Sequence, residues 1–163
     1  MEKTKETSDL EKKLDDVLAI LLRKSAGSRV TLRIDDAARG WNVDFICAEA
    51  VRSGIKSLRG DGSIDQRGAA TVKWMAANKR NLIQPDIVNN PDPAPPPALM
   101  GVYAAKAQML SPLFSATGYL SGWISVHYVE GTHPFTDDEV RALDDARADV
   151  MHLSGIASPS AAQ

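Results

Sequence analysis

Apolar residues recur at helical spacing close to the start of the chain. Between residues 8 and 24 they fall three or four positions apart, the spacing that places side chains on one face of a helix: Leu10, Leu14, Val17, Leu18, Leu21 and Leu22. Charged residues occupy the other side, and Ser8 and Glu11 have the spacing of a capping box. The pattern predicts an amphipathic helix over 8–24 with one face against a core.

Two segments after this helix show the features of strands. In residues 29–35 (RVTLRID), the apolar residues Val30, Leu32 and Ile34 alternate with Thr31, Arg33 and Asp35. This alternation predicts a half-buried strand. Residues 41–49 (WNVDFICAE) indicate a second strand, and Arg39-Gly40 marks the turn between the two. The pair is therefore predicted to form an antiparallel hairpin.

The middle of the chain is punctuated by glycine and proline. Residues 67–79 are rich in alanine and predict a helix, for which Asp65 is an N-cap candidate, and residues 82–84 predict a short strand. Five of the seven residues from 91 to 97, including the last three in a row, are proline. Such a run fits neither a helix interior nor a central strand, so it predicts a stiff surface loop.

The last third of the chain predicts two strands and a helix. The strands cover residues 106–114 and 120–129, and the turn between them is Ser-Ala-Thr-Gly. Thr136 and Glu139 form a second capping-box pattern at the start of a helix over 137–152. Strands gathered into hairpins favour an antiparallel sheet, so the fold class is predicted to be α+β.

Composition and charge narrow the function. A length of 163 residues with 44% hydrophobic residues fits one domain. The net charge of -2 gives no basic face for nucleic acid and no polybasic patch for a membrane. The charged N-terminus has no signal-peptide pattern, and no apolar run is long enough to cross a bilayer. With Cys47 as the single cysteine, a reducing compartment is expected, and the protein is expected to be cytoplasmic.

Three segments in a fixed order resemble the GAF domain family. They are RVTLRID after a leucine-rich helix, RGAATVKWMAANKRNLIQPDIVNNPD, and AQMLSPLFSATGYLSGWISVHYVEGTHPFTDDEVRAL. The resemblance, which extends to the PAS-related architecture, implies a central antiparallel sheet with the N- and C-terminal helices on one face and a ligand pocket on the other. We expect an N-terminal helix in 1–27, a GAF-like domain in 28–154 and a flexible tail in 155–163.

Polar residues on neighbouring strands are the candidate ligand contacts. Trp123, Ser125 and His127 share one face of their strand, and can form an apolar pocket wall with a few polar groups. Alternatively, Trp123 fills core space and His127 is a hydrogen-bonded core histidine. Lys106 and Gln108 on the preceding strand could hold a carboxylate or phosphate, or could be an exposed lysine and a cross-strand partner.

Three further residues are weaker candidates for ligand binding. Gln84 and Asp86 flank a proline at the start of the variable loop, where such residues often pin a loop instead. Tyr103 could close over a bound ring, although an aromatic residue at such a position also fits a core. The candidate ligand-binding set therefore comprises Gln84, Asp86, Tyr103, Lys106, Gln108, Trp123, Ser125 and His127.

These residues favour a small-molecule-binding module, such as a metabolite sensor, with an anionic or aromatic ligand. The alternative is a small lyase, isomerase or hydrolase in which His127 acts as acid or base. Free methionine sulfoxide reductases, a GAF branch, use cysteines where this chain has Ala69–Thr71 and Met100–Lys106, which argues against that activity. We expect no metal and no cofactor, with a haem ligated by His127 as the alternative, and a homodimer through the terminal helices.

Overall fold

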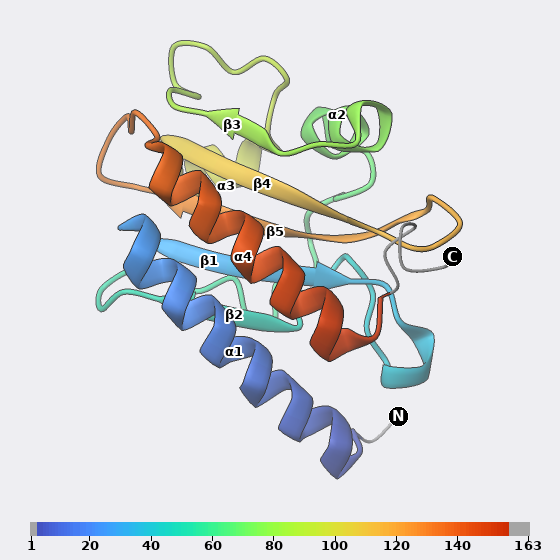
Figure 1. The fold of residues 1–163 in the computed structure, drawn as a ribbon. Coiled ribbons are helices and arrows are strands. Elements are labelled where there is room, and N and C mark those ends of the chain that lie inside the picture. Colours follow the sequence, from blue (N-terminus) through green and yellow to red (C-terminus); the bar gives the residue numbers. More distant parts are fainter. Residues whose placement is uncertain (1–2, 157–163) are drawn as a thin grey trace.

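The computed structural model describes residues 3–156 and shows one five-stranded antiparallel sheet, in the strand order β2-β1-β5-β4-β3 (Figure 1). The strands are β1 (Arg29–Ile34), β2 (Ala48–Val51), β3 (Leu82–Gln84), β4 (Ala107–Phe114) and β5 (Leu120–Tyr128). The helices are α1 (Lys5–Ser25), α2 (Ala70–Asn78), α3 (Pro97–Gly101) and α4 (Asp137–Ser154), with a 3-10 turn at Ala37–Arg39. The α+β class predicted from the sequence is confirmed.

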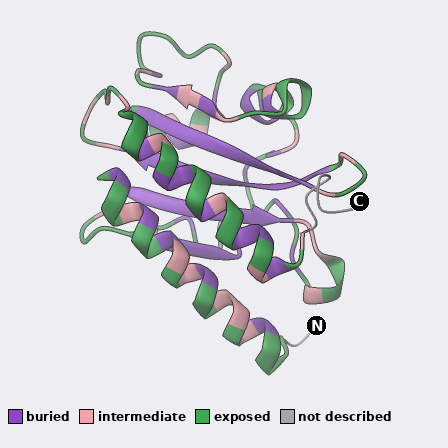
Figure 2. Cartoon of the chain, in the orientation of Figure 1, coloured by how far each residue is buried: buried purple, intermediate pink, exposed green. Residues whose placement is uncertain are grey.

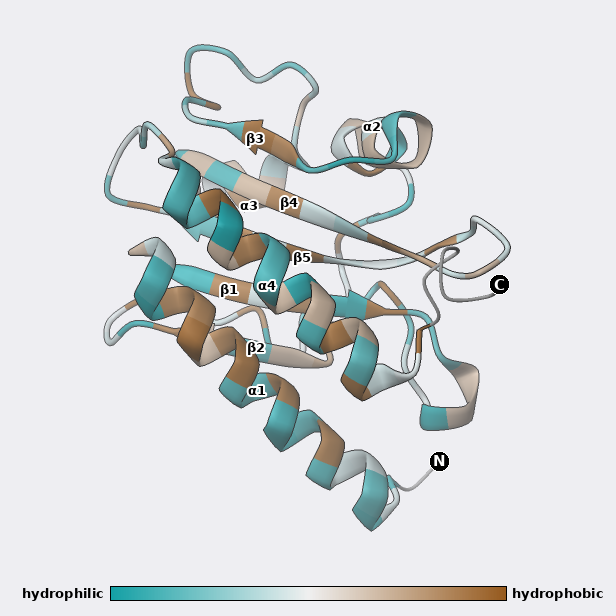
Figure 3. Ribbon diagram, in the orientation of Figure 1, coloured by the Kyte–Doolittle hydropathy of each residue, from teal (hydrophilic) through white to brown (hydrophobic). Residues whose placement is uncertain are grey.

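The terminal helices α1 and α4 lie side by side on one face of the sheet, as predicted (Figure 1). The apolar stripe of α1 faces inward, so that Leu14, Leu18 and Leu21 are fully buried (Figure 3). Ile20 is the large hydrophobic residue that α1 leaves exposed, at 45%. The leucines are therefore used within the chain, and the homodimer through these helices stays a prediction that light scattering can test.

The helix ends follow capping chemistry, with one shift from the prediction. Thr136 and Glu139 form the predicted capping box at the start of α4. The helix α1 begins earlier than its predicted start at residue 8, because the Thr4 side chain accepts a hydrogen bond from the Thr7 backbone N–H. Thr4 is thus the N-cap, and Ser8 lies inside the helix.

The prediction of a strand over 41–49 is wrong for most of its length. The chain forms one isolated bridge between Asp36 and Trp41, then turns through a loop, and β2 begins only at Ala48. Short-range hydrogen bonds within the loop, such as that from the Asp44 N–H to the Asn42 side chain, compete with strand pairing. The antiparallel pairing of β1 with β2 is confirmed.

The second face of the sheet is covered by residues 52–69, by α2 and α3, and by the segment that joins these two helices. Together these parts are called the cover. The helix α2 begins at Ala70, and Asp65 is not its N-cap; its carboxylate accepts from the Gly68 N–H in the preceding turn. The proline run forms a loop as predicted, and its last member, Pro97, opens the short helix α3. Proline suits a first helical position because that N–H has no helical partner.

At the C-terminal end, Gly155 closes α4 in the left-handed conformation that glycine adopts readily. Most of the predicted flexible tail, residues 157–163, lies outside the described residues. Among residues 3–156, no helix combines the length and apolar character needed to cross a bilayer.

Candidate functional site

The central strands are buried along their whole length (Figure 2). Their face away from α1 and α4 carries polar side chains, among them Arg29, Gln108 and His127. The register of β1 against β5 places Arg29 opposite His127, and Thr31 opposite Ser125. A close approach at Gly122 supports this register, because a Cβ at that position would lie 2.0 Å from the backbone oxygen of Arg33. One face of the sheet thus gathers hydrogen-bonding groups beneath the cover.

A small cavity lies between this face and the cover, with a volume of about 10 Å³. Four of the sequence candidates, Gln108, Trp123, Ser125 and His127, line it together. The remaining lining residues come from β1, β4, α2, α3 and the cover segments: Thr31, Arg33, Leu58, Gln66, Thr71, Val72, Pro96, Leu99 and Leu110. Such a volume accommodates about one water molecule.

Three polar atoms on this lining lack a hydrogen-bond partner although they are buried. They are Nε2 of Gln66, Oε1 of Gln108 and Nε2 of His127, and no other buried side-chain nitrogen or oxygen within residues 3–156 is without one. A buried polar atom without a partner costs about 1–3 kcal/mol, so most are satisfied in folded proteins. Their concentration around one cavity makes this cavity the candidate functional site.

Arg29 is fully buried and holds His127 in position. Its Nε donates to Nδ1 of His127 at 3.0 Å, and its two terminal nitrogens donate to the carbonyl oxygens of Lys56 and Tyr103 at 2.7 and 3.0 Å. Burial lowers the pKa of Arg29. Burial, followed by the charges of Arg29 and Arg33, lowers the pKa of His127 well below 6.5, so the imidazole is neutral at neutral pH.

Arg33 is the second buried guanidinium on this face. It donates to the carbonyl oxygen of Val43 at 2.9 Å, and burial lowers its pKa to about 10. Among the ion pairs of the described residues, neither Arg29 nor Arg33 takes part. Buried charges in proteins are usually paired, so this face carries two positive charges that no carboxylate of the described residues neutralises by an ion pair.

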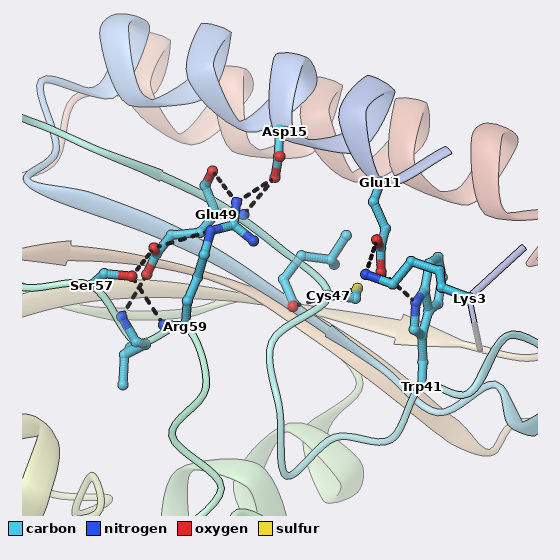
Figure 4. A network of polar contacts seen from close by, with 10 residues as sticks. Lys3, Glu11, Asp15, Trp41, Cys47, Glu49, Ser57 and Arg59 are labelled. Atoms are coloured by element: carbon cyan, nitrogen blue, oxygen red, sulfur yellow. Dashed lines mark hydrogen bonds and ion pairs between the residues drawn. The ribbon is translucent and has the colours of Figure 1, made fainter. Parts of the chain in front are cut away.

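The cover is tied to the sheet edge and to α1 by carboxylates (Figure 4). The buried carboxylate of Glu49 on β2 accepts from the Ser57 hydroxyl and, at 2.7 Å, from the backbone N–H of Leu58. Asp15 on α1 accepts from Arg59 and from the Glu49 N–H, each at 2.9 Å. These bonds hold Leu58, which lines the cavity, in place.

An outer groove of about 510 Å³ lies beside the cavity. It is formed by residues 63–65, 68–70 and 94–98, and Pro96 lines both the groove and the cavity. The cover is latched nearby, where the Tyr103 hydroxyl donates to the carboxylate of Asp61. Pro96 is therefore a wall that the two spaces share.

The other sequence candidates occupy different places. Gln84 is buried behind Gln108, and accepts from its Nε2 at 2.7 Å. Tyr103 is buried behind Arg29, whose guanidinium carbon lies 5.3 Å from the ring centroid. Lys106 is exposed, and Asp86 caps its own loop by accepting from the backbone N–H groups of Val88 and Asn89. The structure therefore brings neither Lys106 nor Asp86 to the cavity.

Sequence reasoning missed the residues that dominate the electrostatics of this site. Arg29 and Gln66 were not singled out, and Arg33 was placed on a strand face without a role. The alternation in β1 contains the missing signal, since Arg33 lies on the polar side of that strand. Knowing that β1 pairs with β5 would have placed both arginines beside Trp123 and His127.

Comparisons with known proteins identify the fold. No protein-family model and no curated protein sequence matches the chain. Among solved structures, it resembles the cyanobacteriochrome receptor PixJ, with 18% identity, a TM-score of 0.69 and coverage of 91% of this chain and 97% of that one. It also resembles the Thermosynechococcus elongatus PixJ GAF domain, with 16% identity, a TM-score of 0.64 and coverage of 95% of this chain and 92% of that one. A far-red-absorbing domain with bound biliverdin is 14% identical, with a TM-score of 0.62 and coverage of 98% of this chain and 100% of that one. The chain therefore has a GAF-type fold.

These neighbours correct one expectation. The sequence led us to expect no cofactor, and the resemblance to domains that include one with bound biliverdin contradicts this. Two observations bear on how a bilin would fit here. The single thiol of the chain, on Cys47, belongs to the core beneath α1 and α4 rather than to the cavity lining, and the cavity is much smaller than a tetrapyrrole. Covalent attachment through a cysteine in the cavity is thus not provided by these residues.

Proposed function

We propose that this protein is a small-molecule-binding domain whose ligand is a small anion, held between the sheet and its cover. The observation that carries the proposal is a pair of buried guanidiniums without an ion-pair partner on this face of the sheet: Arg33 lines the cavity, and Arg29 lies behind His127. An anionic ligand would supply the missing negative charge, and a guanidinium matches carboxylate and phosphate geometry. The apolar groove beside Pro96 suits a planar body attached to that charge.

The nearest carboxylates do not replace such a ligand. Glu49 raises the pKa of Arg29, and Asp61 and Asp44 raise that of Arg33, but none outweighs the effect of burial. The two oxygens of Glu49 are also occupied by Ser57 and Leu58. The positive charge of the face therefore remains available to a ligand.

The enzymatic alternative needs His127 to take up a proton. That step would place a third positive charge beside Arg29 and Arg33, in a site where burial already opposes it. The geometry instead presents His127 as a neutral hydrogen-bond donor. Binding without turnover is thus the function that the site supports better, and a sensor of an anionic metabolite is its simplest form.

The test compares an anion with a neutral analogue of the same shape. Calorimetry and thermal shift would use benzoate and benzyl alcohol, with biliverdin IXα followed by absorption spectroscopy as a larger anionic probe. We expect benzoate, but not benzyl alcohol, to raise the melting temperature of the protein. Arg33→Met should lower benzoate affinity about tenfold, as the loss of one charge-assisted hydrogen bond implies.

Arg23→Met is the matched control, because Arg23 is exposed on α1 and far from the cavity lining. It should leave affinity unchanged. Failure of all the anionic probes to bind, or equal affinity of wild type and Arg33→Met, would contradict the proposal. Conversion of a probe to product, lost in His127→Ala, would favour the enzyme.

A further inference from the structure

The side-chain amide of Gln108 has its orientation fixed by a chain of hydrogen bonds. The carbonyl oxygen of Pro93 can only accept, so the atom of Gln84 that lies 2.8 Å from it must be Nε2. Oε1 of Gln84 then faces Gln108, which must donate through its own Nε2 at 2.7 Å. Oε1 of Gln108 is left in the cavity wall as an acceptor without a donor.

The imidazole of His127 is fixed in the same way. Nε–H of Arg29 can only donate, so Nδ1 of His127 accepts, and the single proton of the neutral ring lies on Nε2. This Nε2–H is a donor without an acceptor. Both side chains are 1% exposed, so water outside the cavity does not satisfy them.

These two groups are neighbours across the sheet. In the register of β4 against β5, Gln108 lies directly opposite His127. Side chains at directly opposite positions have Cβ atoms about 5 Å apart and lie on the same face. The wall thus offers one acceptor and one donor side by side, with Arg33 further along the same face, opposite Trp123.

One common chemical group complements an adjacent donor and acceptor. An open-chain secondary amide is trans, so its N–H and C=O point in opposite directions. A small ring forces the amide to be cis and turns both groups toward the same edge. A lactam or cyclic imide therefore can accept from Nε2–H of His127 through its carbonyl oxygen while its N–H donates to Oε1 of Gln108.

We propose that the ligand is a planar, anionic ring molecule with a cis-amide edge, which pairs with His127 and Gln108, and a negative charge directed toward Arg33. This inference rests on the proposed function, since it specifies the ligand of the same cavity. In the closed arrangement, a single water molecule fits the space and can contact the same two groups. The ligand takes its place when the Pro96 wall moves.

The experiment uses orotate, a planar ring with a carboxylate, two carbonyl groups and two ring N–H groups. Benzoate keeps the charge but has no N–H, and uracil keeps the cis-amide edge but has no carboxylate. Calorimetry on the intact protein should show orotate binding at least tenfold more tightly than either. Buried polar groups left unpaired by the wrong ligand produce discrimination of this size or greater.

Two variants assign the difference to the named atoms. Gln108→Met removes the acceptor, and His127→Asn removes the donor while its amide oxygen can still accept from Arg29. Each should lower orotate affinity about tenfold and leave benzoate affinity unchanged, so benzoate reports whether the variant still has a folded cavity. Lys106→Met, at an exposed position beside the same strand, is the control and should change neither affinity.

The outcomes separate the two proposals. Equal affinity of wild type for orotate and benzoate would overturn the cis-amide edge and leave the anion site standing. If Gln108→Met and His127→Asn lowered the affinity for orotate and for benzoate by the same factor, the cis-amide edge would also be overturned. Binding of neither anion by wild type would overturn this inference. If biliverdin IXα also failed to bind, the proposed function would be overturned with it.

Discussion

The two faces of the sheet are buried to a similar degree and are built from different chemistry. Against α1 and α4, strand residues such as Leu32, Ile124 and Val126 are 0% exposed and belong to one hydrophobic core cluster. On the opposite face, Arg29 and His127 are at most 1% exposed, yet both are polar. Burial therefore does not distinguish the two faces, whereas buried polar atoms without a hydrogen-bond partner occur on the second face.

The difference indicates a division of work within one small domain. The apolar face supplies stability, because every buried methylene contributes roughly 0.8 kcal/mol. The polar face retains unpartnered atoms that lower stability, and such groups persist in folded proteins where they have a use. Substitutions on the first face should therefore lower stability and leave ligand affinity unchanged, whereas substitutions on the second should change ligand affinity.

The largest expected effect tests the apolar face. Leu18→Ala removes a fully buried side chain beneath α4, and a cavity of this kind costs about 3 kcal/mol of unfolding free energy. Urea denaturation measures the loss, and benzoate affinity of the folded protein should not change. Ile20→Ala on the same helix, where the side chain is 45% exposed, should cost below about 0.5 kcal/mol. Similar losses in both variants would refute the assignment of this face.

A second effect comes from acid and tests the polar face. His127 has a pKa well below 6.5 in the folded chain and takes up a proton near 6.5 once unfolded. Its contribution to stability is therefore complete above pH 6.5 and is lost as pH falls, by up to about 1.4 kcal/mol per pH unit. Unfolding free energies at pH 7 and pH 5 should differ less in His127→Asn than in wild type. His152→Asn, exposed on α4, serves as the matched control and should keep the wild-type pH dependence.

The smallest effect concerns the hydrogen bond from the Tyr103 hydroxyl to the carboxylate of Asp61, which is the latch of the cover. Hydrogen bonds from Ser63 and Tyr103 lower the pKa of Asp61 from 3.8 to about 2. The folded state thus favours the carboxylate, and this stabilisation is present above pH 4 and lost as pH falls toward 2. Asp61→Asn should reduce the drop in melting temperature between pH 4 and pH 3. A drop unchanged from wild type, with Asp16→Asn on α1 as control, would show that the latch has no energetic role.

Much of the fold could be predicted because its signals are local. The capping box at Thr136, the alternation in β1 and the proline run each depend on a few consecutive residues, and each is where it was expected. The strand predicted over 41–49 failed because short-range polar contacts around Asn42 replaced strand pairing. Local pattern does not show which of two competing sets of hydrogen bonds is better satisfied.

The site was harder to predict because it depends on contacts distant in sequence. His127 and Gln108 were predicted to share a face because both lie on strands with clear alternation, and both line the cavity. Arg29 bonds to a residue 98 positions away, and Gln66 belongs to a segment without periodicity. Lys106, by contrast, was chosen for its charge, and it is exposed at the residue before β4 begins. Charge and residue type indicate chemistry, but sheet register decides which groups meet.

The single cysteine of the chain can report local opening of the structure through its reaction with a thiol reagent. Cys47 is 6% exposed, and burial raises the pKa of its thiol to about 12. A thiol reagent at neutral pH should therefore react slowly, and faster when the loop before β2 separates from the core. The labelling rate, measured by mass spectrometry with and without benzoate, would show whether ligand binding makes these openings rarer. To label the cover with a fluorescent dye at an introduced cysteine, Cys47 would first be replaced in a Cys47→Ala variant, so that the dye attaches at one position.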